Sequence, residues 1–185
     1  MKRILLTLSA VLFVGAFAFA QQKIGYVDTK YILENIPEYN AAQEQVDQLS
    51  VDWQKEIEGK FAEIDKLYKS YQAEQVLLPE DIKKKRQDEI LNKEKEAKEL
   101  QKKRFGNDGD LFKKRQELIK PIQDKLYNAV NDIGTKGNYM IVFDKSSDLI
   151  MLYVSPKIDI SDQVLESLGY KPGGFGTNKD DNKPK

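Results

Sequence analysis

The 185-residue sequence predicts an α+β fold in which a long antiparallel two-helix coiled-coil arm stands on a small body of β-strands. Two observations predict this fold. Pro37, Pro79 and Pro121 are spaced at equal intervals of 42 residues, and the two segments between them have the apolar spacing of helices. Short strand-like segments, in contrast, occur before the first of these prolines and after the last. Because proline interrupts a helix, the three positions separate two helices of similar length from the rest of the chain.

The arm is predicted at residues 37–121, with its tip near residues 77–80. An apolar run at residues 76–78 ends at Pro79, and the acidic Glu80 suits the start of a new helix. If the chain reverses here, residues equally distant from Pro79 lie level on two antiparallel helices. At 1.5 Å per residue, such an arm is about 63 Å long.

Most level positions match in apolar character or in charge, although Lys55/Lys103 and Lys60/Lys98 are exceptions. Level apolar pairs include Ile36/Ile122, Tyr39/Ile119, Val46/Phe112, Trp53/Phe105 and Phe61/Ala97, and level pairs of opposite charge include Glu56/Lys102 and Glu63/Lys95. Exposed ion pairs contribute about 0–1 kcal/mol each, so they set the register rather than the stability. The glycines Gly59, Gly106 and Gly109 are not level, and no sharp hinge is expected. The alternative is two unrelated helices that happen to be similar in length.

The body is predicted to comprise residues 21–36 and 122–170. Its expected elements are strands at residues 23–28, 139–143 and 150–154, a polar turn at 144–148 and a short helix at 161–168. Asp159 or Ser161 can cap that helix, and Gly169 can end it. Three short strands and one small helix bury little surface, which makes a lone body marginal.

Several copies of the chain are therefore expected to oligomerise by joining their strands into one sheet, which would leave no open edges. The residues expected to mediate this oligomerisation are Ile24, Tyr26, Val27, Ile141, Phe143, Leu152 and Val154. The alternative is a monomer whose three-stranded sheet packs on the root of the arm.

The two ends of the chain have their own compositions. Residues 1–20 combine a basic start, an apolar middle and an Ala18-Phe19-Ala20 ending, which is typical of a secretory signal peptide cleaved after Ala20. The alternative is an uncleaved membrane anchor. Residues 171–185 are rich in Gly, Pro, Lys and Asp and are predicted to be disordered.

The composition argues against several function classes. The chain contains no histidine and no cysteine, which removes the commonest general base, thiol nucleophiles and most transition-metal sites. We therefore expect no enzyme activity, no cofactor and no metal. Removing Lys2 and Arg3 from the 30 basic residues leaves 28, against 30 acidic residues. A near-neutral mature chain argues against nucleic acid as a partner.

The arm carries the candidate binding residues. The triplets at 102–104 and 113–115 are both Lys-Lys-Arg and lie eleven residues apart, about three helical turns, so a continuous helix would present both on one face. Such a basic stripe suits the binding of acidic chains or anionic lipid. The alternative is a solvent-exposed face whose positive charge balances the acidic first helix of the arm. The candidate contact residues are Trp53, Phe61, Tyr68, Tyr71, Phe105, Phe112, Lys102, Arg104, Lys113 and Arg115. Packing is the first role of these rings, but a thin arm leaves part of each ring accessible.

Four segments carry a resemblance to a known family. Residues 23–28 (KIGYVD), 117–125 (ELIKPIQDK), 137–144 (GNYMIVFD) and 159–165 (DISDQVL) resemble the Skp (OmpH) family of periplasmic chaperones. The resemblance implies a jellyfish-like homotrimer, with a strand-built body and three helical tentacles around a cavity. It also implies that the protein holds unfolded outer-membrane proteins in the periplasm without ATP and delivers them for outer-membrane assembly.

One departure from the family pattern limits what the resemblance implies. Well-known members are markedly basic, and this mature chain is not, so no lipopolysaccharide site is carried over. The alternative function is a secreted coiled-coil spacer or adaptor of the cell envelope, which would bind one folded partner and show no preference for unfolded chains.

Overall fold

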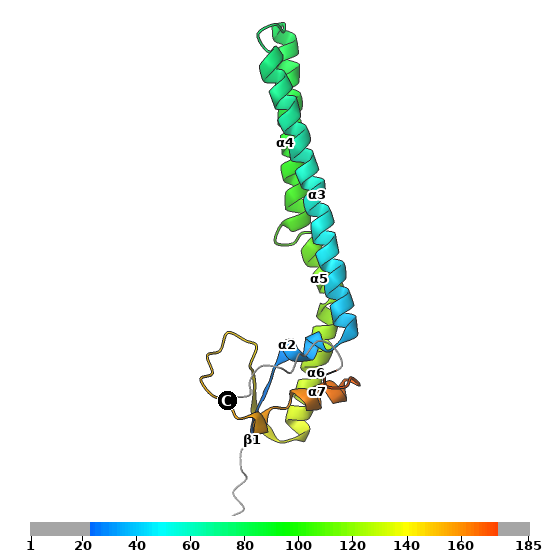
Figure 1. Cartoon of the computed structure of the whole chain (residues 1–185), viewed down its shortest axis with the longest axis vertical. Coiled ribbons are helices and arrows are strands. Elements are labelled where there is room, and N and C mark those ends of the chain that lie inside the picture. Colours follow the sequence, from blue (N-terminus) through cyan, green and yellow to red (C-terminus); the bar gives the residue numbers. More distant parts are fainter. Residues whose placement is uncertain (1–22, 174–185) are drawn as a thin grey trace, which may run out of the picture.

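The structure, a computed structural model, describes residues 23–173. The predicted signal peptide at residues 1–20 and the predicted disordered tail from residue 174 onward lie outside the described residues. Figure 1 shows one long arm that rises from a small body. Within residues 23–173, no helix has both the length and the apolar character needed to cross a membrane.

The arm is a pair of helices that run in opposite directions beside each other (Figure 1). Its helices are α3 (Pro37–Glu74), α4 (Glu80–Phe105) and α5 (Asp110–Leu118), after which the chain enters the body through α6 (Lys120–Lys136). Pro37 occupies the first turn of α3, Pro79 precedes α4 and Pro121 lies in the first turn of α6. Each proline therefore lies at a helix start, where its missing N–H leaves no internal hydrogen bond unmade. This confirms the interpretation of the proline spacing.

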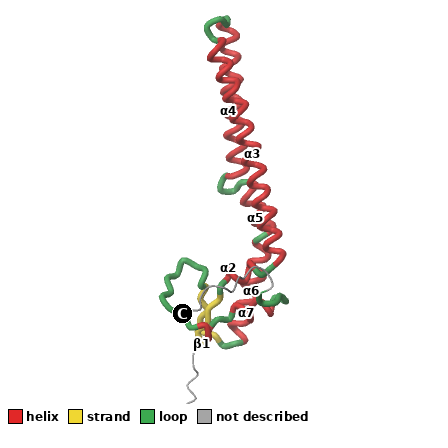
Figure 2. Tube along the Cα trace, in the orientation of Figure 1, coloured by secondary structure: helices red, strands yellow, loops and turns green. Residues whose placement is uncertain are grey.

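The return path of the arm is interrupted between α4 and α5, at residues 106–109. Figure 2 shows this interruption as a loop beside the uninterrupted α3. A Cβ atom at Gly106 would collide with the carbonyl oxygen of Lys102, and one at Gly109 would lie 2.8 Å from that of Arg104. Only glycine fits at these two positions, because the loop folds back closely on the last turn of α4. The sequence did not predict an interruption of this kind.

Above the interruption, the two helices keep nearly the predicted register. The side-chain amide of Gln87 donates to the Tyr71 hydroxyl at 2.7 Å, and these two residues are equally distant from Pro79. Further down, Glu63 pairs with Lys93 at 2.9 Å rather than with the predicted Lys95. The prediction that residues equally distant from Pro79 lie opposite each other is therefore accurate to about two residues in the upper arm.

Below the interruption, residues of the return helices lie opposite α3 residues that are nearer to the tip than predicted. Ile119 was expected opposite Tyr39, but it is buried in one cluster with Ala42 and Val46, against which Tyr39 packs from the side. Phe112, the predicted partner of Val46, is 45% exposed. Because residues 106–109 loop out of the helix, everything that follows them lies nearer to the tip than a continuous helix would place it.

The body contains a two-stranded parallel sheet. β1 (Lys23–Val27) pairs with β2 (Tyr139–Asp144), with Ile24 opposite Ile141 and Val27 opposite Asp144. Parallel strands need a crossover connection, and here the whole arm is that connection. The backbone N–H of Lys145 continues the ladder by donating to the carbonyl of Val27 at 2.7 Å.

The core of the body is built from helices packed around the sheet. α2 (Thr29–Glu34), α6 and α7 (Ser161–Ser167) enclose it, and a short 3₁₀ helix, η1 (Pro156–Ile158), leads into α7. The core residues are Val27, Ile32, Leu33, Ile36, Leu126, Ile160, Val164 and Leu165. Asp159 and Ser161 were the predicted caps of α7, but its N-cap is Ile160, which makes no side-chain cap hydrogen bond. Asp159 lies one residue earlier and accepts from the backbone N–H and hydroxyl of Ser161, and Gly169 (φ +89°) follows the end of the helix.

The prediction of a third strand at residues 150–154 is wrong. The turn after β2 is held by Asp144, whose carboxylate accepts from Ser146 and whose carbonyl accepts from Ser147. This turn carries the chain away from the sheet, so residues 150–154 pair with no strand among the described residues. A segment without a ladder partner cannot satisfy its backbone groups as a strand. Leu152, expected on that strand, is 96% exposed.

Candidate functional site

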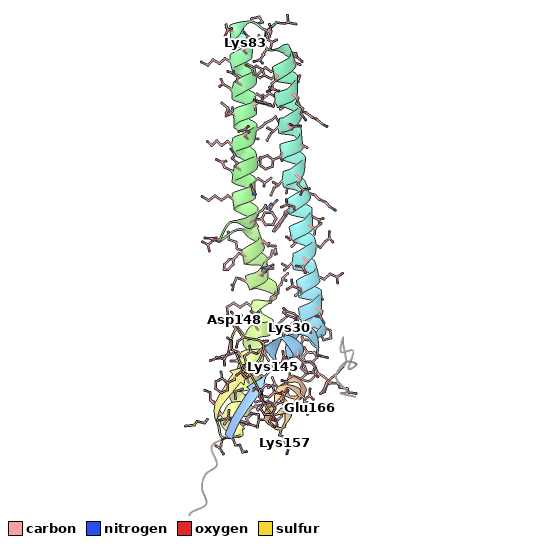
Figure 3. All side chains as sticks on the ribbon, turned by 60° about the vertical axis from the view of Figure 1, so that its left-hand side comes forward. Lys30, Lys83, Lys145, Asp148, Lys157 and Glu166 are labelled. Carbon is pink, nitrogen blue, oxygen red and sulfur yellow. The ribbon has the colours of Figure 1, made fainter. Side chains whose placement is uncertain are left out.

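The surface of the arm carries apolar side chains that remain open to solvent. Those of the described arm residues are Val51 (47% exposed), Phe61 (38%), Tyr68 (48%), Val76 (85%), Leu77 (86%), Leu91 (60%) and Phe112 (45%). They are spread along α3, α4, α5 and the tip rather than gathered in one patch. Figure 3 shows that side chains project from all round both helices, with Lys83 near the tip.

Helix geometry accounts for these exposed positions. A helix in a two-helix arm can cover only one face against its neighbour, so apolar residues beside that face are half-covered. The described residues buried in the upper arm are few, and Ile64, Ile90 and Ala97 form their main cluster, with Leu67 and Tyr71 packed on it. A thin core of this kind leaves room for contacts with a second molecule.

The predicted aromatic contact residues fall into two groups. Phe61, Tyr68 and Phe112 are exposed, whereas Trp53, Tyr71 and Phe105 are half-buried between the helices. Val51, Leu91 and the tip residues Val76 and Leu77 were not among the predicted contacts. Their exposure could not be read from the sequence, because it depends on the register of the two helices.

The predicted basic residues are also divided. Lys102, Lys113 and Arg115 are exposed, but Arg104 is engaged within the arm by Trp53, Glu56 and Asp110. The argument that both triplets share a face assumed a continuous helix, and the loop at residues 106–109 removes that assumption. The loop itself brings lysines of both triplets together, since Lys102, Lys103 and Lys113 line one shallow groove beside it.

The predicted oligomerisation residues differ in exposure. Tyr26 and Val27 are 5% and 3% exposed, so they already belong to the core of their own chain. Ile24, Ile141 and Leu152 are exposed, while Phe143 and Val154 are half-buried.

Further exposed apolar residues were missed by the sequence analysis in the same region. Met140 (66%), Leu149 (51%), Ile150 (86%) and Tyr153 (84%) all present large apolar surface to solvent. A nearby groove between α2, α6 and the sheet has an apolar lining that includes Val27, Leu33, Leu126, Val130 and Val142. An exposed apolar loop and an apolar groove on one small body are typical of an interaction surface.

The electrostatics of the body are organised around Asp144. Burial raises the pKa of its carboxyl, but hydrogen bonds from Thr29 and Ser146 outweigh burial and hold the pKa below its ordinary value of 3.8. The Thr29 hydroxyl donates at 2.8 Å, and so does the Ser146 hydroxyl. This carboxylate ties the start of α2 to the end of β2.

On the arm, the clearest electrostatic pair is exposed. A hydrogen bond from Lys93 lowers the pKa of Glu63, and the same bond raises the pKa of Lys93. The two residues lie on facing helices, so the pair reports the register of the upper arm. Solvent and salt screen exposed pairs strongly, and the pair contributes to alignment more than to stability.

Across residues 23–173, no cluster of acidic side chains has the arrangement needed to hold a metal ion. The arrangement instead provides many separate, weak apolar contacts on a long and highly charged surface. Such a surface can hold an extended chain at many points, each of which is easily broken.

Comparisons with known proteins give a consistent result. The family described as "Outer membrane protein (OmpH-like)" matches residues 23–168, a range that includes all four segments on which the family resemblance rests. A solved structure of a proposed outer membrane chaperone (OmpH-like) from Caulobacter crescentus CB15 is similar, with a TM-score of 0.61 and 14% sequence identity. The similarity covers 80% of this chain and 85% of that chain. The search of curated proteins gave no match.

Proposed function

Because this chain belongs to the OmpH-like family, we propose that it is a holdase chaperone that acts in the periplasm without ATP. Its clients are unfolded outer-membrane proteins, which it binds in a cavity between helical arms and delivers for outer-membrane assembly. The predicted signal peptide at residues 1–20 supports export, and the absence of histidine and cysteine supports a binding role over catalysis.

The observation that carries this proposal is the exposure of large apolar side chains along an arm rich in charge. Phe61, Tyr68 and Phe112 are 38–48% exposed and lie on two different helices. An unfolded outer-membrane protein offers alternating apolar residues over its whole length, so it meets such side chains repeatedly. Each contact is weak, and the client stays bound but unfolded. Release needs no nucleotide when the membrane offers the client a more stable state.

The basic groove beside the arm's loop extends this surface. Lys102, Lys103 and Lys113 line it together with Asp108 and Asp110, so it presents both signs of charge. The lysines suit acidic client segments or the anionic headgroups of a membrane surface, and their long stems can cover apolar groups.

We further propose that three copies assemble through the body, with the arms enclosing the client. Among the described residues, β2 pairs only with β1, so its other edge is open, while the other edge of β1 bonds to Asp159 and Ile160 through Tyr26. Residues 149–153 present an exposed apolar segment. Pooling these segments in a homotrimer would cover apolar surface that a single body leaves in water. Ile24, Ile141 and Leu152 are the predicted contact residues that remain exposed for this purpose.

An aggregation assay tests the holdase function. Urea-unfolded outer-membrane protein is diluted into buffer with or without the purified protein, and turbidity is followed. We expect suppression near one trimer per client. A spacer or adaptor with a single folded partner would leave the turbidity unchanged, and that result would overturn the proposal.

A matched pair of variants connects the assay to the arm. The triple variant Phe61→Ser, Tyr68→Ser, Phe112→Ser removes exposed rings, and we expect it to require several-fold more protein for the same suppression. The control Lys60→Ser, Lys66→Ser, Gln116→Ser changes three exposed polar side chains on the same two helices. An equal loss in both variants would argue against apolar client contacts.

The assembly is tested separately by light scattering, which we expect to give the mass of three chains. Leu152→Asp with Tyr153→Asp places charges on residues that are 96% and 84% exposed in the single chain. These changes should shift the mass toward one chain without altering helix content. A one-chain mass for the unaltered protein would remove the cavity mechanism.

A further inference from the structure

The loop at residues 106–109 divides the arm into an upper and a lower part on its return side only. α3 passes the loop without a break, whereas α4 ends at Phe105 and α5 begins at Asp110 (Figure 2). Two glycines within the loop weaken any intrinsic preference for one path, because glycine can adopt more backbone conformations than any other residue. The relative placement of α4 and α5 therefore depends on side-chain contacts across the loop.

One side chain makes such contacts with both neighbouring helices. The guanidinium carbon of Arg104 lies 4.6 Å from the centre of the Trp53 ring, which belongs to α3. Its Nη1 donates to Asp110 Oδ2 at 2.7 Å, and its Nη2 donates to Glu56 Oε2 at 3.4 Å. Arg104 belongs to the last turn of α4, Asp110 opens α5, and Trp53 and Glu56 lie one turn apart on α3. We call these four residues the Arg104 clasp.

The Arg104–Asp110 contact of the clasp is shielded from solvent on both sides, whereas the Glu56 side chain is 42% exposed. The side chain of Arg104 is 23% exposed and that of Asp110 is 25% exposed, whereas the Lys69–Asp65 pair on α3 is 71% and 56% exposed. The Arg104 Nε is buried and makes no hydrogen bond to any described residue. Partial burial weakens screening by solvent, and a flat guanidinium stacked on an indole adds a cation–π attraction.

The chemistry of the clasp requires arginine. Its guanidinium presents separate N–H groups in a fixed plane, so it can donate to Asp110 and Glu56 while its face lies on Trp53. A lysine ammonium is a single point charge and cannot make all three contacts in this geometry. The neighbouring Lys102 and Lys103 are exposed and line the groove instead.

From these contacts we propose that Arg104 is a positioning residue that fixes α5 relative to α4 on the continuous α3. Arg104 thereby fixes the alignment of α5 against α3 after the loop and keeps the arm in one shape. Without it, the two glycines let the lower return helix shift along α3, and the arm samples several shapes. This inference goes beyond the proposed function, because it concerns the arm in the absence of any client.

Pulsed electron–electron distance measurements test the clasp in the full chain. The protein has no cysteine, so cysteines introduced at Lys95 and Gln116 carry the only two spin labels. Both positions are exposed, and they lie on either side of the loop, about 32 Å apart if joined by an ideal helix. Labelled chains are diluted with unlabelled chains so that each distance comes from one arm.

We expect one narrow distance distribution in the protein with native Arg104. Arg104→Ala should at least double its width or move its maximum, and Arg104→Lys should give an intermediate width. Asp110→Asn should broaden the distribution as well, because it removes the negative charge from the contact between Arg104 and α5 and leaves the contacts with α3 unchanged. Lys103→Ala, in the adjacent exposed position, serves as the control and should leave the distribution unchanged.

The outcomes separate the clasp from general stability. Helix content by circular dichroism shows whether each variant folds, and if Arg104→Ala does not fold, Asp110→Asn decides alone. Distributions with the same width and the same maximum in the native protein and in the folded clasp variants would overturn the inference. No client is present in this experiment, so its result does not depend on the aggregation assay, and either proposal can fail without the other.

Discussion

The body and the arm of this protein bury their apolar residues in different ways. In the body, Ile32, Val164 and Leu165 are completely buried in one cluster that unites two strands and three helices. In the arm, the buried residues form separate small clusters along the seam, and α4 contributes only Ile90 and Ala97. A single shared core makes its elements depend on each other, whereas a seam of small clusters lets each part of the arm respond locally.

Polar contacts show the same difference. In the body they join residues far apart in the chain, as when the Tyr31 hydroxyl donates to Asp162 at 2.9 Å. On the arm, many join residues one turn apart on one helix, such as Lys69 and Asp65 at 2.6 Å. Contacts within a helix add to its local stability but do not fix it to a neighbour. The arm therefore gains length and accessible surface, and the body supplies the firm attachment.

The largest expected effect lies in the core of the body. Leu165→Ala should lower the free energy of unfolding by about 2–5 kcal/mol, because it leaves a cavity among fully buried neighbours. Urea denaturation followed by circular dichroism at fixed chain concentration measures the change. The matched control Leu91→Ala removes the same atoms from a side chain on α4 that is 60% exposed, and it should cost less than about 0.5 kcal/mol. Equal losses would contradict the proposed difference between the two regions.

The same substitution at two equally buried valines compares the regions directly. Val164 in the body and Val46 in the arm are both 0% exposed. We expect Val164→Ala to cost about 2–3 kcal/mol and Val46→Ala about 1–2 kcal/mol, since the thin seam can relax around the lost methyl groups. Hydrogen exchange resolved by element should show faster exchange through the whole body in the first variant. In Val46→Ala, exchange should become faster only within the lower arm. Faster exchange in the body as well would contradict the expectation that the arm responds locally.

A smaller, pH-dependent effect is expected at Asp144. Its folded pKa is lowered, so its contribution to stability is present above the unfolded pKa, near 3.8, and is lost as pH falls through the folded value. Asp144→Asn should cost about 1–2 kcal/mol at pH 7, because hydrogen bonds from Thr29 and Ser146 lose a charged acceptor. Urea denaturation at pH 7 and at pH 3 measures both stabilities. The difference in the free energy of unfolding between the variant and the native protein should be smaller at pH 3 than at pH 7. An equal difference at both pH values would show that titration of Asp144 is not its cause.

The smallest effect is expected for the exposed ion pair of the upper arm. Glu63→Gln removes the partner of Lys93, yet solvent and salt screen this pair, so the urea midpoint should not change measurably at physiological ionic strength. The fluorescence of Trp53, the single tryptophan, reports unfolding of the arm in this experiment. A large loss of stability would show that the arm depends on cross-helix charge more than on its apolar seam.

Local signals in the sequence were sufficient for the helix starts at the three prolines. Pro37, Pro79 and Pro121 all lie at helix starts, because the geometry of proline acts over a few neighbouring residues. The register of the upper arm was also predictable to within two residues, since a tight turn at the tip fixes it. The family could be recognised for a related reason, as the segments that carry the resemblance are continuous in sequence.

The candidate surface was predictable only in part. Phe61, Tyr68 and Phe112 are exposed as the thin arm suggested, but Arg104 and Trp53 face each other inside the arm. No local pattern distinguishes Arg104 from Arg115, which ends an identical Lys-Lys-Arg triplet and is exposed. Their difference arises because the loop at residues 106–109 interrupts the helix between them, so that α4 holds Arg104 against α3 while α5 leaves Arg115 in solvent.

The sequence by itself determined that helices begin at Pro37, Pro79 and Pro121, that histidine and cysteine chemistry is missing and that a long helical arm stands on a small body. Only the tertiary structure decided that β1 pairs with β2 in parallel, that residues 150–154 form no strand and that the return helix breaks at residues 106–109. The physical reason is the distance along the chain over which each kind of interaction acts. Propensities and caps act between neighbours along the chain, whereas pairing, register and exposure depend on the summed packing of residues far apart in sequence.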